Sequence, residues 1–361
     1  MKKNKTFIIA EAGVNHNGSL ELAEKMVDVA VEAGTDAIKF QTFSADQLVT
    51  KTALKAEYQL NTTSIHESQY EMLKRLELSK EDHLHLYHYC AKRNIQFLST
   101  PFDQKSVSFL IDTLQLPIIK ISSGEITTAP LLLQIAKSDC NVILSTGMAT
   151  LGDIETALGV LAFGYLYDKY NKPSNQSFLQ AYCSEEGQKI LKEKVTLLHC
   201  TSEYPVDFAN INLSVLDTLK LAFHLPVGYS DHSKGIAVPI AAVAKGAVLI
   251  EKHFTLGRDM SGPDHLASLE PHELKNMVNA IREIELALGD SCKRPTALEL
   301  STQKIIRKSL VALCPIQNGE LFSEKNLGIK RAGDGISSIH YWNFIQQPAS
   351  RNYNVDELIN E

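Results

Sequence analysis

The stretch VGYSDHSKGIAVPIAAVAKGAVLIEKH, Val227–His253, decides the fold. It begins with a short apolar run, passes through a polar loop into an Ala- and Val-rich segment of helical length, and ends in a second apolar run. Strands that are apolar throughout and joined by a helix are typical of parallel sheets covered on both faces. Working outward from this stretch, the same unit recurs from Phe7 to about Leu288.

The recurring unit gives a series of strand and helix candidates. The expected strands are Thr6–Ala10, Ala37–Gln41, Gln96–Ser99, Ile118–Ile121, Val142–Ser145, Val195–His199, Val227–Ser230 and Val248–Glu251. The expected helices are Leu20–Ala33, Glu67–Leu76, Lys80–Lys92, Ile154–Phe163, Ile236–Ala244 and Pro271–Leu288. About eight repeats over some 280 residues predict an α/β fold, a (βα)₈ TIM barrel, with a doubly wound open sheet as the alternative.

Changes in composition indicate further organisation. The region 164–194, rich in Tyr, Asn, Ser and Gln, is expected to be a surface excursion that lengthens one βα unit. We expect the barrel domain to span 1–290 and a polar linker, which contains Pro295, to span 291–304. Residues 305–361 hold short strand-like pieces and turn residues, which predicts a small, separate, β-rich domain.

The bulk composition excludes several classes of protein. A net charge of -6 argues against a nucleic-acid binder, although a local lysine cluster can still hold an anion. The six cysteines are scattered and form no CxxC pair, which favours reduced thiols. The first residues lack the apolar run of a signal peptide, and nowhere does the chain approach the roughly 18 apolar residues of a membrane span. We therefore expect a cytoplasmic protein that binds neither nucleic acid nor membrane.

Polar side chains stand at the carboxyl ends of nearly all the expected strands. Because these ends face the active site of a barrel, we expect the side chains to converge. Each residue alone could have a purely structural role, for example as a salt-bridged lysine or a core histidine. Burying the whole set without a ligand, however, would be costly. The set comprises Glu11, Lys39, Gln41, Thr100, Lys120, Ser123, Ser145, His199, Ser230, His232 and His253.

Part of this set has the donors needed for an anion. Lysine supplies compact positive charge, and hydroxyl groups supply directed hydrogen bonds. A small dianion such as a phosphorylated carboxylic acid would satisfy the lysines and hydroxyls of Lys39, Lys120, Thr100, Ser123, Ser145 and Ser230.

His232 and His253 end consecutive strands, so they should lie side by side at the barrel mouth. Carboxylates are close in the sequence or at neighbouring strand ends: Glu11, Asp231, Glu251 and Asp264. Paired imidazoles with nearby carboxylates suit a divalent transition metal with open positions. The pattern equally allows one histidine to be a core residue bonded to a backbone carbonyl.

Short motifs agree in order and spacing with the sialic acid synthases. They are AEAGVNHNGS (Ala10–Ser19), IKFQTF, LSTPFD, KISSGE, LSTGMA, LHCTSEYP, GYSDHS, IEKHFT and MSGPDHLASLEP. The chain resembles this family from Phe7 to its end. VALCPIQNGELFSEKN followed by KRAGDGIS resembles the family's C-terminal antifreeze-like (SAF) domain. The N-acetylneuraminate and N,N′-diacetyllegionaminate synthases are more similar than the pseudaminate synthases, which lack the GPDH element.

The resemblance implies an enzyme that joins phosphoenolpyruvate to an open-chain N-acetylated hexosamine and releases phosphate by C–O cleavage. The expected sugar is N-acetylmannosamine, giving N-acetylneuraminate; the alternative is 2,4-diacetamido-2,4,6-trideoxymannose, giving N,N′-diacetyllegionaminate. The residues that it places at phosphoenolpyruvate are Lys39, Lys120, Ser123, Ser145, Ser202 and Ser230. The residues that it places at the amino sugar are Gln41, Glu125, Tyr204 and Asp264.

It also implies a metal and a partner subunit. His232 and His253 match the family's ligands for a divalent ion, usually Mn²⁺, with Mg²⁺ or Co²⁺ as alternatives. Glu11 is our candidate for activating water. Arg331 matches the arginine that the antifreeze-like domain inserts into a neighbouring subunit's site, which implies a domain-swapped homodimer. Arg331-Ala332-Gly333 stands here where the family usually has RPG.

Two rival functions remain open at this point. A Schiff-base pyruvate aldolase of the same barrel class would need a desolvated lysine nucleophile, for which Lys120 is the candidate. A carbohydrate- or ice-binding protein would rely on the C-terminal segment alone. The ring of polar residues at the strand ends argues against this second rival, because a binding module needs no such set.

Overall fold

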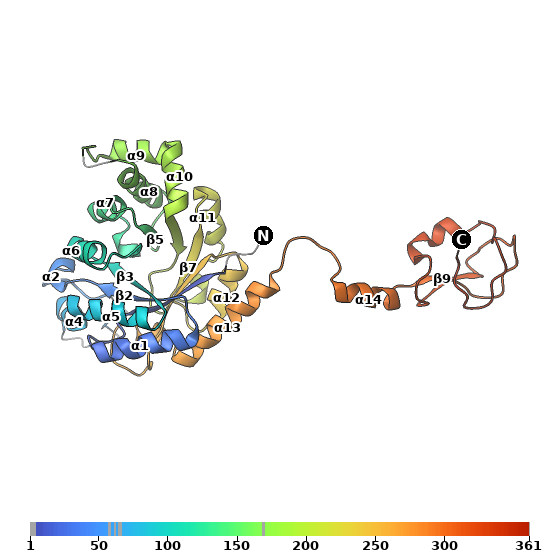
Figure 1. Cartoon of the computed structure of the whole chain (residues 1–361), viewed down its shortest axis with the longest axis horizontal. Helices are drawn as coiled ribbons and strands as arrows, with labels where there is room; N and C mark the ends of the chain where they lie inside the picture. Colours follow the sequence, from blue (N-terminus) through green and yellow to red (C-terminus); the bar gives the residue numbers. More distant parts are fainter. Residues whose placement is uncertain (1–4, 57–58, 61–62, 64–66, 168–169, 361) are drawn as a thin grey trace. The chain divides into compact units, whose positions relative to one another are not determined.

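The recurring apolar runs form eight parallel strands that wrap into a nearly closed barrel (Figure 1). They are β1 (Phe7–Gly13), β2 (Ala37–Thr42), β3 (Gln96–Pro101), β4 (Ile118–Ile121), β5 (Asn141–Ser145), β6 (Val195–His199), β7 (Val227–Asp231) and β8 (Leu249–His253). Their order is β3-β2-β1-β8-β7-β6-β5-β4, and the end strands β3 and β4 also lie in contact. This contact between the two end strands closes the sheet, which confirms the TIM-barrel prediction and makes the open-sheet alternative wrong.

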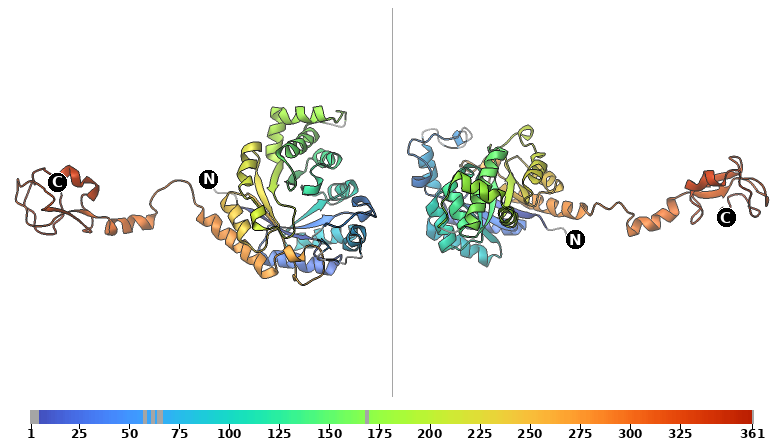
Figure 2. Two further views of the ribbon diagram at one scale, coloured as in Figure 1. Left: turned by 180° about the vertical axis from the view of Figure 1, so that it is seen from behind. Right: turned by 90° about the horizontal axis from the view of Figure 1, so that it is seen from above.

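The computed structural model describes residues 5–56, 59–60, 63, 67–167 and 170–360. By its contacts the chain divides into two units, Met1–Gly289 and Asp290–Glu361. The barrel belongs to the first unit, and Figure 2 shows from two further sides how helices cover it. Among the described residues, no helix is both long enough and apolar enough to span a bilayer.

The helices of the first unit follow the strands along the chain. They are α1 (Leu20–Ala33), α2 (Ala45–Leu48), α4 (Gln69–Leu76), α5 (Lys80–Lys92), α6 (Gln104–Ser108), α7 (Ala129–Lys137), α8 (Leu151–Leu166), α9 (Asn175–Cys183), α10 (Glu185–Lys194), α11 (Val215–Phe223), α12 (Ala237–Ala244) and α13 (Pro271–Ala287). Short π or 3₁₀ turns are η1 (Phe109–Thr113), η2 (Ser123–Glu125), η3 (Phe208–Asn210) and η4 (His265–Ala267). Capping boxes at Ser68, Ser79 and Thr150 satisfy the free N–H groups where α4, α5 and α8 begin.

The excursion expected at 164–194 is largely helical. α8 continues to Leu166, and α9 and α10 follow with Ser174 and Ser184 as their N-caps. The many Tyr, Asn, Ser and Gln residues of this region obscure the apolar period of a helix, which is why its composition did not indicate these helices. Residues 168–169, between α8 and α9, lie outside the described residues.

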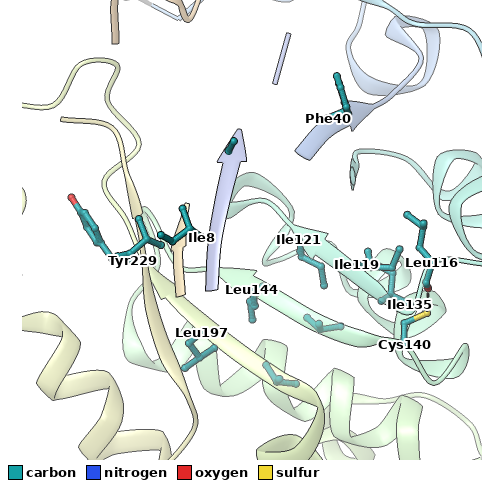
Figure 3. Packing of buried hydrophobic residues seen from close by; sticks show 14 of the residues in the cluster. Ile8, Phe40, Leu116, Ile119, Ile121, Ile135, Cys140, Leu144, Leu197 and Tyr229 are labelled. Atoms are coloured by element: carbon teal, nitrogen blue, oxygen red, sulfur yellow. Dashed lines mark hydrogen bonds between the residues drawn. The ribbon is translucent and has the colours of Figure 1, made fainter. Parts of the chain in front are cut away.

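Side chains of the strands alternate between two environments. Outward-facing residues such as Ile8, Phe40 and Leu144 pack against the helices in the main core (Figure 3). Inward-facing residues form a second cluster inside the barrel: Ile9, Ala37, Leu98, Ile143, Leu198 and Leu249. Because strand side chains repeat every second residue, the next inward positions are Glu11, Lys39, Thr100, Ser145, Cys200 and Glu251. The barrel interior thus changes from apolar to polar toward the carboxyl ends.

The second unit has its own small core. Strands β9 (Ser309–Ala312) and β10 (Leu327–Lys330) pair in antiparallel fashion. Its helical pieces are α14 (Ala297–Ile306), η5 (Ser338–His340) and α15 (Tyr341–Phe344). Its core includes Leu310, Phe322, Leu327 and Tyr353. The segment expected as a polar linker, 291–304, therefore holds most of helix α14.

Candidate active site

A cavity of ≈ 430 Å³ opens above the apolar layer of the barrel. All the predicted site residues except His199 and Arg331 line it. They are Glu11, Lys39, Gln41, Thr100, Lys120, Ser123, Glu125, Ser145, Ser202, Tyr204, Ser230, His232, His253 and Asp264. Arg331 belongs to the second unit, where it follows β10.

Two buried lysines and two buried glutamates face one another at the cavity floor. Lys39 Nζ lies 2.8 Å from Glu11 Oε2 and 3.6 Å from Glu251 Oε2. Lys120 Nζ lies 3.7 Å from Glu251 Oε1. Each of these four side chains is at most 5% exposed. An anion that reaches the floor therefore meets two lysines whose positions are fixed by carboxylates.

The two glutamates differ in their pKa. Burial raises the pKa of Glu11 to about 7, because Lys39 offsets only part of the desolvation. Burial also acts on Glu251, but Lys120 and Lys39 outweigh it and lower the pKa of that carboxyl. Glu251 is thus the fixed anion between the lysines, whereas Glu11 is the group suited to proton exchange near neutral pH.

Hydroxyl groups surround the lysines as expected. Lys39 donates a hydrogen bond to Thr100 Oγ1 at 2.9 Å, and Ser230 Oγ donates one to Glu251 Oε1 at 2.9 Å. Ser123 Oγ accepts from the Gly147 backbone N–H at 3.0 Å. A bound phosphate could accept hydrogen bonds from Lys39 and from these hydroxyl groups in place of the protein acceptors. The hydroxyl groups can do so because they rotate to suit a partner.

The two predicted histidines lie together beside Tyr204. The ring centroids of His232 and His253 are 5.6 Å apart, and the Tyr204 ring is 4.1 Å from His232. His232 Nδ1 donates to the Thr201 carbonyl at 2.6 Å, because a carbonyl only accepts; Nε2 is then the nitrogen left for a ligand. Burial lowers the pKa of His232 to about 4 and that of His253 well below its usual value, so both rings are neutral at pH 7.

The chemistry of these two histidines fits a divalent metal. Within the described part of the chain, no three His, Cys, Asp or Glu side chains gather to form a full ligand set. Orientation of His232 by a backbone carbonyl is nevertheless typical of metal-ligating histidines. His253 Nδ1 is buried without a hydrogen-bond partner among the described atoms, which is costly unless a ligand supplies one.

Two more carboxyl groups lie at the rim of the cavity. Burial raises the pKa of Asp264 to about 6. Burial also raises the pKa of Glu125, which is about half buried. Asp264 can therefore accept hydrogen bonds as an anion or donate one as an acid close to neutral pH.

One side of the cavity is lined by a separate hydrophobic cluster, which we call the apolar wall. Its members come from the loops after β1, β2 and β3 and from α2 and α4. The rings of Phe43 and Phe102 meet edge to face at 6.2 Å. The wall consists of Val14, Phe43, Met72 and Leu76, which are buried, and Leu48, Leu73 and Phe102, which are partly buried; all seven line the cavity.

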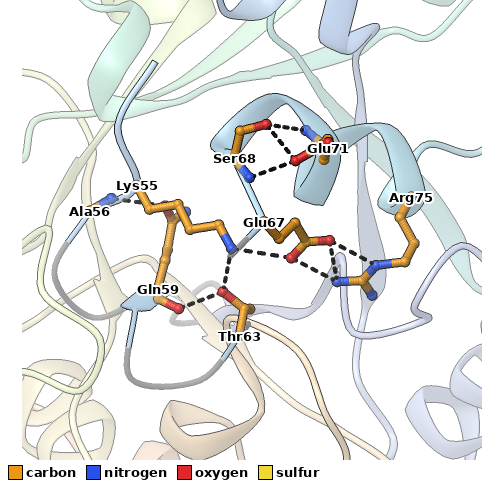
Figure 4. Close-up of polar contacts among 8 residues, drawn as sticks. All are labelled: Lys55, Ala56, Gln59, Thr63, Glu67, Ser68, Glu71 and Arg75. Carbon is orange, nitrogen blue, oxygen red and sulfur yellow. Dashed lines mark hydrogen bonds and ion pairs between the residues drawn. The ribbon is translucent and has the colours of Figure 1, made fainter. Parts of the chain in front are cut away.

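A polar network holds the segment that leads into α4 (Figure 4). Lys55 Nζ lies 3.1 Å from Glu67 Oε2 and donates to Thr63 Oγ1 at 2.9 Å. Arg75, on α4, lies 3.2 Å from Glu67 Oε1. Thr63 Oγ1 in turn donates to the Gln59 carbonyl at 2.6 Å. The network therefore ties Gln59, which lines the cavity, to the helix that carries much of the apolar wall.

The strand-end prediction missed some features and included one residue wrongly. His199 does not line the cavity; its Nε2 contacts the Ile211 carbonyl at 2.7 Å, which is the core-histidine explanation. Glu251 was expected only as a nearby carboxylate, although it contacts both lysines. The sequence could have indicated this, because Glu251 stands two residues before His253 on the same strand and therefore faces the barrel interior with it. The apolar wall had no such signal, because its members come from five separate segments.

A parallel barrel with buried lysines, hydroxyls and paired histidines at its strand ends defines a class of enzymes that act on small anions. Comparison with protein families identifies the family within this class to which the chain belongs. The NeuB family model matches residues 26–293, and the chain belongs to this family. The resemblance to the sialic acid synthases is thereby confirmed.

Individual relatives are similar over nearly the whole chain. The chain is 50% identical to N,N′-diacetyllegionaminic acid synthase of Campylobacter jejuni, covering 99% of both chains. It is 44% identical to N,N′-diacetyllegionaminic acid synthase of Legionella pneumophila, covering 96% of this chain and 91% of that one. The crystal structure of N-acetylneuraminic acid synthetase from Leptospira borgpetersenii, in complex with citrate, matches with a TM-score of 0.65 and 35% identity, covering 84% of this chain and 93% of that one.

Proposed function

We propose that this chain is a nonulosonic acid synthase that condenses phosphoenolpyruvate with an open-chain N-acetylated hexosamine. The observation that carries the proposal is that Lys39 and Lys120 lie buried in a cavity that two histidines also line. A floor with two lysines and several hydroxyls suits a phosphorylated carboxylic acid. The names of the relatives support the same reaction class.

The chain's own residues account for the polar steps. Lys39 and Lys120 neutralise the phosphate that departs when the C–O bond breaks. Glu11 activates the water that adds to the phosphate-bearing carbon, since its raised pKa of about 7 suits proton exchange. Asp264 and Glu125 position sugar hydroxyls at the rim.

His232 and His253 are the residues that would hold a divalent metal. Mn²⁺ is our first choice, with Mg²⁺ or Co²⁺ as alternatives. When bound, such an ion supplies Lewis-acid polarisation of the sugar aldehyde. The buried, unpaired Nδ1 of His253 and the carbonyl-oriented ring of His232 support this assignment.

Two sugars are candidates for the acceptor. N-acetylmannosamine, our first expectation, would give N-acetylneuraminate. The names of the relatives at 50% and 44% identity favour 2,4-diacetamido-2,4,6-trideoxymannose over it, because the sialic acid synthetase of known structure is only 35% identical. We therefore propose the trideoxy sugar as the preferred acceptor.

Our proposal for the role of the second unit rests on its sequence resemblance. VALCPIQNGELFSEKN and KRAGDGIS support an antifreeze-like SAF domain that begins near residue 305. On the same grounds we propose a domain-swapped homodimer in which Arg331 contacts the amino sugar bound by the partner subunit. A guanidinium group suits an acetamido carbonyl because it offers several donors in a fixed plane.

A phosphate-release assay with both sugars tests the proposed function. Phosphate should form only when phosphoenolpyruvate and an amino sugar are both present, and kcat/KM should be higher for the trideoxy sugar. In water labelled with heavy oxygen, the label should enter C2 of the product and not the phosphate. Labelled phosphate would require P–O cleavage and a different mechanism.

One observation keeps the aldolase alternative testable. Burial lowers the pKa of Lys120, a property that a Schiff-base lysine needs. Treatment with pyruvate and borohydride would trap an aldolase covalently at Lys120. A synthase should keep full activity after this treatment.

A further inference from the structure

The cavity changes from cationic to apolar along single strands. Lys39, Gln41 and Phe43 all line the cavity, as alternate residues of one strand and its continuation should. Thr100 and Phe102 repeat the change along β3 and its continuation. On this side of the barrel, a ligand held at the floor extends past an amide group and then meets the apolar wall.

The other loops give the rim a different character. Glu125 follows β4, Ser202 and Tyr204 follow β6, and Asp264 follows β8, and all four line the cavity. The rim therefore offers hydrogen-bonding groups on one part of its circumference and hydrocarbon on another. A ligand that matches it needs polar substituents and an apolar end.

The proposed reaction determines where the apolar end of the sugar lies, because it fixes the position of the aldehyde. The sugar aldehyde must approach phosphoenolpyruvate, which the lysines hold at the floor, so the far end of the open-chain sugar extends toward the rim. Gln41, which we place at the sugar, stands two residues before Phe43 on the same side of the chain. The sugar carbon farthest from the aldehyde, C6, is then the one that reaches the apolar wall.

We infer that the apolar wall selects the acceptor by a methyl group at C6, so that a 6-deoxy amino sugar is preferred over its 6-hydroxy counterpart. This inference rests on the proposed function and names the part of the site that sets its specificity. The four buried members of the wall are at most 8% exposed, and their side chains offer no hydrogen-bonding group, so a hydroxyl group held against them would lose water without gaining a partner from them. Hydrophobic pockets disfavour an added hydroxyl group by roughly 100-fold.

A pair of sugars that differ in one oxygen atom isolates this effect. N-acetylmannosamine and its 6-deoxy counterpart carry the same groups at C2 and C4. With saturating phosphoenolpyruvate, the kcat/KM ratio of the wild-type enzyme should favour the 6-deoxy sugar by roughly 100-fold. A ratio near one, or one that favours the hydroxylated sugar, would overturn the inference.

Variants of the wall then test which residues set the ratio. Leu73→Asn places an amide in the wall, and Phe43→Tyr adds a single oxygen at a buried position; each should lower the ratio by roughly tenfold. Leu133→Asn is the matched control, because Leu133 is also partly buried on a helix, α7, but packs against the main core and does not line the cavity. It should keep the wild-type ratio.

The possible outcomes distinguish a failure of this inference from a failure of the proposed function on which it rests. Phosphate release with an unchanged ratio in both wall variants would overturn the inference and leave the synthase standing. No phosphate release from phosphoenolpyruvate with any amino sugar would remove the proposed function and the inference together. Phe43→Tyr is the decisive variant if Leu73→Asn fails to fold, because it preserves the ring.

Discussion

At the scale of single residues, the cavity floor depends on a balance of charge. Glu251 lies within 3.7 Å of both lysines and accepts a hydrogen bond from Ser230. Buried lysines are tolerated only when an anion compensates them. Glu251 therefore supports the fold in the absence of substrate, and an anionic substrate competes with it for the same lysines.

Replacing Glu251 with Gln should expose this dual role. We expect Glu251→Gln to lower the free energy of unfolding by about 3 kcal/mol, because two buried lysines lose a counter-charge. Inorganic phosphate should then raise the Tm of the variant more than that of the wild type, which thermal melts with and without phosphate would measure. Ser230→Ala removes only a hydrogen bond and should cost about 1 kcal/mol. Equal phosphate shifts in Glu251→Gln and wild type would contradict this account.

Removing either histidine should remove the metal. His232→Ala and His253→Ala should each abolish activity and lose bound Mn²⁺ while the far-ultraviolet circular dichroism stays unchanged, because a two-histidine site cannot retain an ion with one ligand missing. Metal content of the purified variants is the direct measurement. His199→Gln is the control, since His199 lies outside the cavity and should keep the ion. Full metal occupancy in either alanine variant would rule out these ligands.

At the scale of elements, glycines set how closely α8 approaches its neighbours. A methyl group on Gly164 would lie 2.5 Å from Ala136 Cβ on α7. A methyl group on Gly159 would lie 2.9 Å from the Phe178 carbonyl oxygen on α9. The excursion after α8 is thus packed through backbone contacts and is part of the folded barrel unit.

Alanine substitutions along α8 should have opposite effects on stability. Gly159→Ala and Gly164→Ala should each lower the free energy of unfolding by about 1–3 kcal/mol, because the added methyl group overpacks a helix contact. Gly152→Ala, whose new methyl group would meet only Thr150 Oγ1 at 3.7 Å, should instead raise it by up to about 1 kcal/mol through helix propensity. Urea unfolding of the three variants measures both signs. A stabilised Gly159→Ala would show that α8 and α9 can separate at little cost.

The individual strands and helices also show how much of the fold could be predicted from the sequence. The β-branched runs of all eight strands were visible, but Gly13 and Pro101 were left out, because barrel pairing extends a strand past residues of low strand propensity. Helix α9 was missed because its Tyr, Asn, Ser and Gln residues carry little apolar period. The polar ring at the strand ends, apart from His199, was predictable because the carboxyl ends of barrel strands face the active site. The apolar wall was not, because only the folded chain brings Val14 and Leu73 to one surface.

At the scale of the whole molecule, each of the two units buries its own core. The barrel unit packs around Ile9, Leu98 and their neighbours, whereas the second unit packs around Leu310 and Phe322. A unit with its own core can be expected to fold without the other. The proposed contribution of Arg331 to a partner's active site can therefore be tested without damage to the barrel.

Mixing an impaired variant with an inactive one tests this contribution. Arg331→Ala should lower kcat/KM for the sugar while the KM for phosphoenolpyruvate changes little, because the guanidinium is proposed to contact only the sugar. After subunit exchange with His232→Ala, activity should return, since one site of a mixed dimer combines an intact barrel with an intact Arg331. Steady-state assays before and after exchange measure the recovery. Impaired Arg331→Ala enzyme that exchange never rescues would place the arginine in its own subunit's site.

The alternation along β2 has a consequence for how this gene can change in length. Deleting the single codon of Ile38 would shift every later residue of the strand by one position, so Lys39 and Gln41 would turn toward the helices and Phe40 toward the cavity. One deletion would thus remove two polar side chains from the cavity and one ring from the core together. A deletion in the exposed loop at residues 171–173, ahead of α9, reverses no side chain of the barrel. In-frame insertions and deletions in descendants of this gene should therefore accumulate in such loops and avoid the strands.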